Sequence, residues 1–254
     1  MSTDNPFTSP EGGHQPNYEA GQGVQARSSV DYLEIFGKVF EHPNWFVNIL
    51  LTGLVAFIPF IGAIVINGFG INILHARSTG QTNSYPNFDF NNFGDYLVRG
   101  LWMFLVGIVV TLGLLPVFVI DFGVLFIAQA TRSDALVMIA FLFHIIFVFG
   151  LSVLLNLFIV PILIRAGMRS SFGEAFDFAW IKDFVSKMWL EQILGLIIWG
   201  VISWFITVVG MLAFCIGIIP AIGVVFIAYW NFLTQLYQVY VSRGGQPIPF
   251  QANT

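Results

Sequence analysis

Residues 101–130 read LWMFLVGIVVTLGLLPVFVIDFGVLFIAQA, and residues 135–164 read ALVMIAFLFHIIFVFGLSVLLNLFIVPILI. Each stretch is longer than the roughly 20 residues that cross a hydrocarbon core about 30 Å thick. Two further apolar blocks cover residues 45–74 and 188–241. All four are continuous runs of Ile, Leu, Val and Phe and lack the alternating polarity of barrel strands, so they predict helices. The expected fold is an all-α, polytopic transmembrane helical bundle.

The composition excludes several classes of protein. The chain is 57% hydrophobic and only 9% charged, whereas about 25% of the residues in a typical globular domain are charged. Its net charge of −4 and its lack of a basic cluster exclude a protein that binds nucleic-acid phosphates. The single cysteine, Cys215, lies in an apolar run, so we expect a small residue facing lipid or the core. Histidines and carboxylates show no metal-ligand or catalytic spacing, and we therefore expect neither a cofactor nor an enzyme.

Three segments are expected along the chain. Residues 1–29 combine Pro and Gly with Ser, Asn and Gln and lack an apolar signal-peptide core. This composition predicts a disordered cytoplasmic tail. Residues 30–245 are expected to form the transmembrane domain, and residues 246–254 a short cytoplasmic tail.

The positions of bends and cations predict the topology. Bends near Pro59, Leu115-Pro116 and residues 217–220 would divide the apolar blocks into about six helices, arranged as three hairpins. Nine of the ten Lys and Arg residues then lie on the side of both termini, and only Arg132 lies opposite. By the positive-inside rule, this side is cytoplasmic and the protein belongs in the cytoplasmic membrane. For the first block, a re-entrant hairpin and a single helix kinked at Pro59 remain alternatives.

The three expected hairpins share one construction, which predicts an internal repeat over residues 30–77, 88–165 and 172–243. Each unit begins with a stretch whose aromatic residues fall on one face, which is typical of an amphipathic helix lying at the membrane interface. Each unit ends at an arginine, and we interpret Arg77, Arg165 and Arg243 as membrane anchors. The aromatic spacing also occurs in ordinary amphipathic helices, so the order of the parts carries the prediction.

Several short stretches resemble one known family. They are residues 58–62 (IPFIG), 85–90 (YPNFDF), 94–101 (GDYLVRGL) and 171–177 (SFGEAFD). Together they resemble the domain of unknown function 4013 family over about residues 30–245. The chain departs from the family pattern at Phe88, where tryptophan is usual, and at Tyr85, where leucine is usual. The resemblance implies a prokaryotic multipass membrane protein and implies no activity or functional residues.

Polar residues inside the apolar blocks are the candidates for an intramembrane site. His144 lies among phenylalanines and isoleucines about 15 Å from the polar residues 131–134. A neutral imidazole joining two helices by hydrogen bonds explains it, and a proton-coupled role would require a carboxylate partner. We expect Asp121 at the far interface, either solvated or capping a helix. Asn67, Asn156 and Asn231 complete the candidate site, with interhelical hydrogen bonds as their simplest role.

The lack of a catalytic cluster favours a non-catalytic scaffold or accessory subunit of a membrane complex. Its expected partners are the lipid bilayer and other membrane subunits, and its oligomeric state is open. The alternative is a transporter or channel for a small molecule or lipid, with a polar path between the hairpins. That alternative requires His144 and several of the asparagines to face one water-accessible cavity.

Overall fold

The computed structural model describes residues 23–213 and 216–251, and all the regular structure in these residues is helical. The prediction of an all-α protein is therefore confirmed. Cys215 and residues 1–22 of the predicted tail lie outside the described residues. In chain order the elements are α1 (Glu34–Phe40), α2 (Trp45–Ala56), α3 (Ile61–Ser78), the 3-10 turn η1 (Phe90–Asn92), α4 (Phe93–Ala130), α5 (Asp134–Arg169), α6 (Phe172–Ala175), α7 (Phe178–Leu212) and α8 (Ile218–Ser242).

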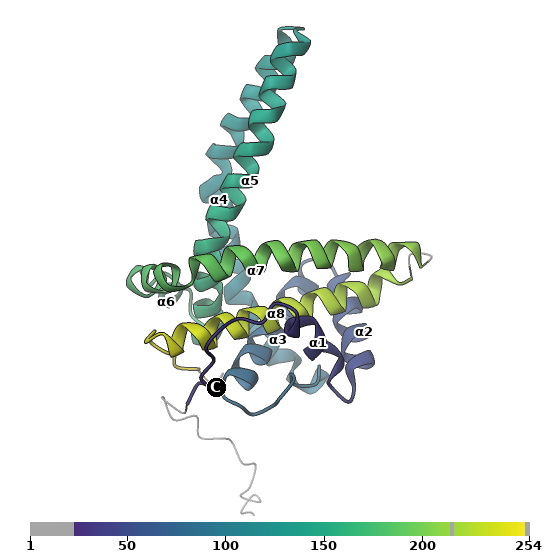
Figure 1. The fold of residues 1–254 in the computed structure, drawn as a ribbon, viewed down its shortest axis with the longest axis vertical. Coiled ribbons are helices and arrows are strands. Elements are labelled where there is room, and N and C mark those ends of the chain that lie inside the picture. The colour runs from purple at the N-terminus through teal and green to yellow at the C-terminus, as the bar shows by residue number, and fades with distance from the viewer. Residues whose placement is uncertain (1–22, 214–215, 252–254) are drawn as a thin grey trace, which may run out of the picture.

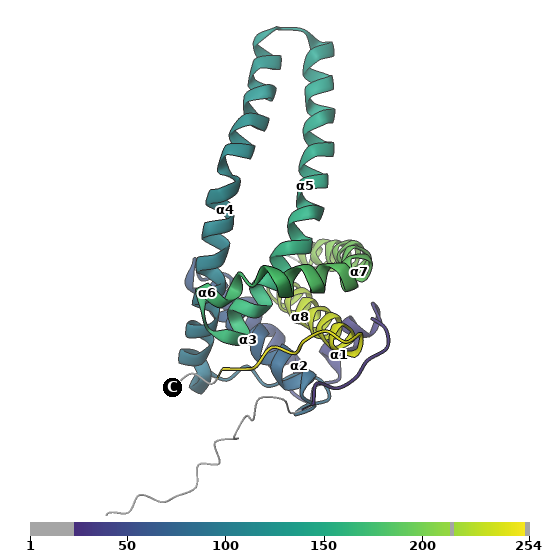
Figure 2. The same cartoon turned by 90° about the vertical axis from the view of Figure 1, so that its left-hand side faces the viewer.

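The molecule has a helical base from which one long hairpin projects (Figure 1). The base contains α1 to α3, α6 to α8 and the ends of α4 and α5 nearest to them. The helices α7 and α8 run across the direction of the hairpin in the first view, and α4 and α5 run side by side to a turn in the second (Figure 2). We call residues 107–156 the projecting hairpin and residues 131–133 its tip.

Burial separates the projecting hairpin from the base. Between residues 107 and 156, only Asp121 and Ala140 are buried, and most of the large apolar side chains are exposed. Residues 107–130 of α4 extend about 36 Å at about 1.5 Å per residue, which is enough to cross a hydrocarbon core of about 30 Å. The base does not cover this surface, so lipid or helices of other chains must surround it.

Four of the described helices are long and apolar enough to cross a membrane, namely α4, α5, α7 and α8. The first apolar block does form two helices, with α2 ending at Ala56 and α3 beginning at Ile61. A single helix kinked at Pro59 is therefore wrong. At 12 residues, α2 is only about 18 Å long, and much of α3 is buried against the rest of the base. The predicted count of six spans is therefore not confirmed.

The bend expected at Leu115-Pro116 is absent. The helix α4 continues through Pro116 to Ala130, and the chain reverses at residues 131–133, where Arg132 has a positive φ of 55°. Proline removes one backbone hydrogen bond, and a long helix in an apolar environment can accommodate that loss locally. The polar residues of the tip supply the actual turn.

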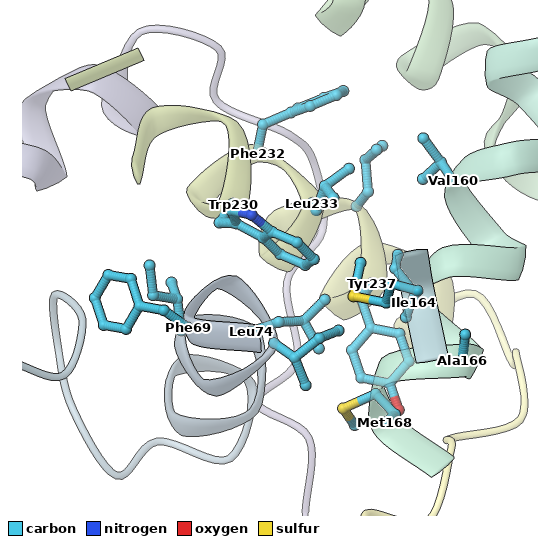
Figure 3. Packing of buried hydrophobic residues seen from close by; sticks show 14 of the residues in the cluster. Phe69, Leu74, Val160, Ile164, Ala166, Met168, Trp230, Phe232, Leu233 and Tyr237 are labelled. Carbon is cyan, nitrogen blue, oxygen red and sulfur yellow. The ribbon is translucent and has the colours of Figure 1, made fainter. Parts of the chain in front are cut away.

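The core of the base surrounds α8. Trp230 and Leu233 of α8 are buried between Phe69 and Leu74 of α3 on one side and the lower part of α5 on the other (Figure 3). Most residues from Ala228 to Tyr240 of α8 are buried, including residues on every face of the helix. A helix that is buried all round is a central element of its fold. The base is therefore a packed protein core and not only a set of membrane spans.

Glycines allow the backbones of the base to touch. A Cβ added at Gly68 of α3 would lie 1.9 Å from the carbonyl oxygen of Tyr96, and one at Gly100 of α4 would lie 1.8 Å from that of Ile64. At the crossing of α2 and α8, a Cβ at Gly223 would lie 2.1 Å from the carbonyl oxygen of Ile49. Small residues at such crossings permit close packing of apolar helices.

The crossing of α3 and α4 leads to a stability prediction. We expect Gly100→Ala to lower the free energy of unfolding by about 1–3 kcal/mol, because the new methyl group would overlap a backbone oxygen. Gly107→Ala on the same helix is the matched control, since no atom lies within 4 Å of the Cβ position there. Unfolding of both variants in detergent measures the difference. Equal stability of the two variants would contradict the observed crossing.

Candidate functional site

The projecting hairpin contains a hydrogen-bonded pair formed by Asp121 and His144. The Nδ1 atom of His144 on α5 lies 2.5 Å from Oδ2 of Asp121 on α4. Asp121 is only 3% exposed, and the ring of Phe122 lies beside the imidazole. The expectation that Asp121 is solvated or caps a helix is therefore wrong, because α5 covers it in the middle of the hairpin.

The geometry of the pair requires a shared proton. A carboxylate oxygen can only accept a hydrogen bond, and an unprotonated Nδ1 can only accept one as well. Two acceptors at 2.5 Å would repel each other, so one proton lies between Nδ1 and Oδ2. The other carboxylate oxygen of Asp121, Oδ1, is buried without a hydrogen-bond partner in the described structure.

A pocket of about 410 Å³ opens beside the pair, between α4 and α5. His144 lines it together with the polar side chains of Gln129 and Asp134, which lie toward the tip. Leu125, Val137, Met138 and Phe141 form its apolar wall. The pocket thus connects the imidazole with the polar end of the hairpin.

The three predicted asparagines form hydrogen bonds with partners other than His144. Asn67 of α3 bonds to the carbonyl oxygen of Ala63 and lines a second pocket of about 410 Å³ with Thr111. Asn156 of α5 bonds to the carbonyl oxygen of Ser152 within its own helix. Each of these bonds stays within one turn of one helix. His144 and Asn67 line different pockets, and Asn156 and Asn231 line neither of these two.

Asn231 instead belongs to a buried polar network of the base. Its side-chain oxygen accepts a hydrogen bond of 2.7 Å from Nη1 of Arg77, and its amide nitrogen donates to the carbonyl oxygen of Ile35. Arg77 is 6% exposed, and burial lowers the pKa of its guanidinium to about 10. It therefore remains charged at neutral pH, and Asn231 supplies an acceptor for that charge. The network joins α1, α3 and α8.

The other two predicted anchor arginines also bond within the protein. Arg165 pairs with Asp177 at 3.0 Å and donates from Nε to the carbonyl oxygen of Glu174. Arg243 pairs with Glu191 and donates to the carbonyl oxygen of Lys187. Both arginines thus tie the end of one apolar stretch to α6 or α7.

Residues 246–251, within the expected C-terminal tail, pack against the base. The backbone of Gln251 donates to the carbonyl oxygen of Met168 and accepts from Nη2 of Arg99. The guanidinium of Arg99 also lies 4.0 Å from the ring centroid of Phe250, and the ring of His75 stacks on the same phenyl at 3.6 Å. We call residues 246–251 the C-terminal strap. It joins α3, α4 and α5.

The described chain also begins in contact with the base. The backbone of Gln25 donates to the carbonyl oxygen of Ser78, and that of Arg27 donates to the hydroxyl of Ser242. Both residues lie in the segment expected to be disordered, so ordered structure begins before residue 30. The start of the described chain therefore meets the ends of α3 and α8.

Comparison with known proteins identifies a family for this chain but no individual relative. The model of a family described as a protein of unknown function (DUF4013) matches residues 51–219, more than half of the chain. No curated protein and no solved structure matches the chain. The match covers α3 to α7, including the projecting hairpin with Asp121 and His144.

Burial of His75 predicts a loss of stability in acid. Burial and the charge of Arg99 lower the pKa of His75 from 6.5 to about 4. The unfolded chain binds more protons between these two values, so stability falls as the pH falls from about 6.5 to about 4, by up to about 3 kcal/mol.

His75→Gln should remove this part of the pH dependence. Thermal unfolding of wild type and variant in detergent across the same pH range measures it. Burial also lowers the pKa of His42, but its contribution is common to both proteins and cancels in the difference. Parallel curves for the two proteins would refute the assignment to His75.

Proposed function

The chain belongs to the DUF4013 family of proteins of unknown function, and we propose that it is a non-catalytic scaffold or accessory subunit of a membrane complex. The projecting hairpin carries this proposal. Its exposed residues include Ile120, Phe126 and Ile146, each at least two-thirds exposed, and the base leaves them uncovered. A paired set of helices that extends about 36 Å beyond its own core is well placed to meet helices of another subunit in the bilayer.

The same observation disfavours the transporter alternative. A path for a solute needs walls on all sides, and the projecting hairpin consists of two helices. A path through this part of the protein would require further helices from other subunits. The separation of His144, Asn67 and Asn231 also fails the condition of a single cavity set for that alternative.

We propose that the base lies on the cytoplasmic side of the cytoplasmic membrane, with the tip on the opposite side. Nine of the ten cations are in the base and its adjoining segments, and Arg132 is at the tip. This distribution follows the positive-inside rule. Gln25 and Gln251 both bond to the base, which supports cytoplasmic positions for both ends of the described chain.

Site-specific crosslinking tests the proposed scaffold role. A photoreactive amino acid at position 146, where Ile146 is 71% exposed, should crosslink in native membranes to one protein species of defined mass. The same probe at position 178, where Phe178 in the base is 74% exposed, is the matched control and should not. Crosslinks to lipid alone from positions 120, 126 and 146 would overturn the proposal.

Cysteine labelling tests the orientation. In a Cys215→Ser background, which removes the only cysteine, Ser133→Cys places a thiol at the tip and Ser28→Cys places one at the base. We expect a membrane-impermeant maleimide to label the first variant in intact cells and the second only after permeabilisation. The reverse pattern would invert the topology.

A further inference from the structure

We propose that Asp121 and His144 form a proton-binding site inside the bilayer, which exchanges protons with water on the tip side of the projecting hairpin. The pair lies about 15 Å from the tip along each helix, at about 1.5 Å per residue. Within residues 107–156, Asp121 is the only buried ionisable side chain. Ionisable groups at such depth are costly, and they commonly mark proton or ion pathways.

The pair has the capacity to bind a second proton. With one proton between Nδ1 and Oδ2, the pair carries a net charge of −1. The remaining charged groups of the projecting hairpin are Arg132 and Asp134, both next to the tip. Neither lies beside the pair, so no other charged group of the hairpin offsets this charge, and the doubly protonated form has no net charge. Oδ1 is buried without a partner, so the ionised carboxylate has only one hydrogen bond.

The second proton enters at His144. Among the described residues, the hydrogen bond of the imidazole involves Nδ1, which leaves Nε2 on the other side of the ring. A proton from water adds to Nε2, and the proton on Nδ1 moves to Oδ2 of Asp121. One N–H bond forms, another breaks and one O–H bond forms, so the product is a neutral imidazole beside a neutral carboxylic acid. Release of the proton reverses these steps.

The pocket beside His144 provides access from one side. It extends from the imidazole past Gln129 to Asp134, the first residue of α5. Gln129 is exposed and can hold water along this route. The pocket therefore gives a proton from the tip side a route to His144.

The side chains next to the pair are apolar in both directions along the hairpin. Toward the base, residues 112–120 of α4 and 145–151 of α5 contain no polar side chain, and toward the tip the same is true of residues 122–128 and 135–143. The next hydroxyls, those of Thr111 and Ser152, donate to carbonyl oxygens of their own helices at 2.8 and 2.7 Å. The pocket lined by His144 therefore distinguishes the two sides, because it extends toward the tip.

Proton counting on the full chain in lipid nanodiscs tests the site. Difference titration should find one more proton bound by wild type than by Asp121→Asn, and infrared spectra should show a protonated carboxyl band that this variant lacks. His144→Gln should also lose the second proton. Asp134→Asn, which removes the exposed carboxylate of the same hairpin, should keep it. Equal proton binding and identical carboxyl bands in wild type and Asp121→Asn would overturn the proposal.

Access is tested in proteoliposomes of known orientation. A pH step on the tip side should change the carboxyl band at once, whereas an equal step on the base side should not. Equal responses from both sides would refute access from the tip.

A wild-type measurement covers the case in which the variants unfold. Nitrogen NMR of labelled His144 should show Nε2 gaining a proton together with a carbon shift of Asp121. A His144 signal that is constant over the whole pH range in which the protein stays folded would overturn the site.

Discussion

The backbone contact of α3 with α4 at Gly68 and Gly100 determines where the projecting hairpin stands on the base. The lower part of α4, up to about Val106, is held by this contact, and the lower part of α5 is held against α3, α6 and α7. Beyond these points, the two helices support only each other. A side chain larger than hydrogen at either glycine would force the helices apart, and a small shift at the crossing would become a large displacement at the tip. The rigidity of the base is thus a condition for any specific contact made by the hairpin.

The class of fold was predictable because it depends on apolar length, and length is a property of the sequence itself. The concentration of cations in the base was predictable for a similar reason. The bend at Pro116 was not correctly predicted, because proline marks a turn in water but can remain inside a lipid-exposed helix. The six predicted spans are not confirmed. Residues 45–78 were counted as two of them because they are largely apolar, but α2 is short and much of α3 is buried in the base. Sequence alone does not distinguish burial in protein from burial in lipid.

The candidate site was also only partly predictable from the sequence. Depth in an apolar stretch correctly identified His144 as unusual. Asp121 was missed as its partner, although a signal existed: both residues lie eleven or twelve positions from the centre of the tip, so an antiparallel hairpin places them at one level. That signal could be used only if the turn was placed at residues 131–133, and the prediction instead assumed a bend at Pro116. The bond of Arg77 to Asn231 joins residues 154 positions apart, and no local pattern predicts such a contact.

The C-terminal strap has a consequence for the order of assembly. Residues 246–251 are synthesised after α3, α4 and α5, whose ends they join through Phe250 and Gln251. The projecting hairpin can therefore enter the bilayer while the polar end of the base is still open, with Arg99 lacking its aromatic neighbour. Synthesis that stops before residue 246 would give a chain with its hairpin in place but without the C-terminal strap on the base. Such a chain would expose buried charge and apolar surface together, the features by which quality-control proteases can distinguish unfinished membrane proteins from complete ones.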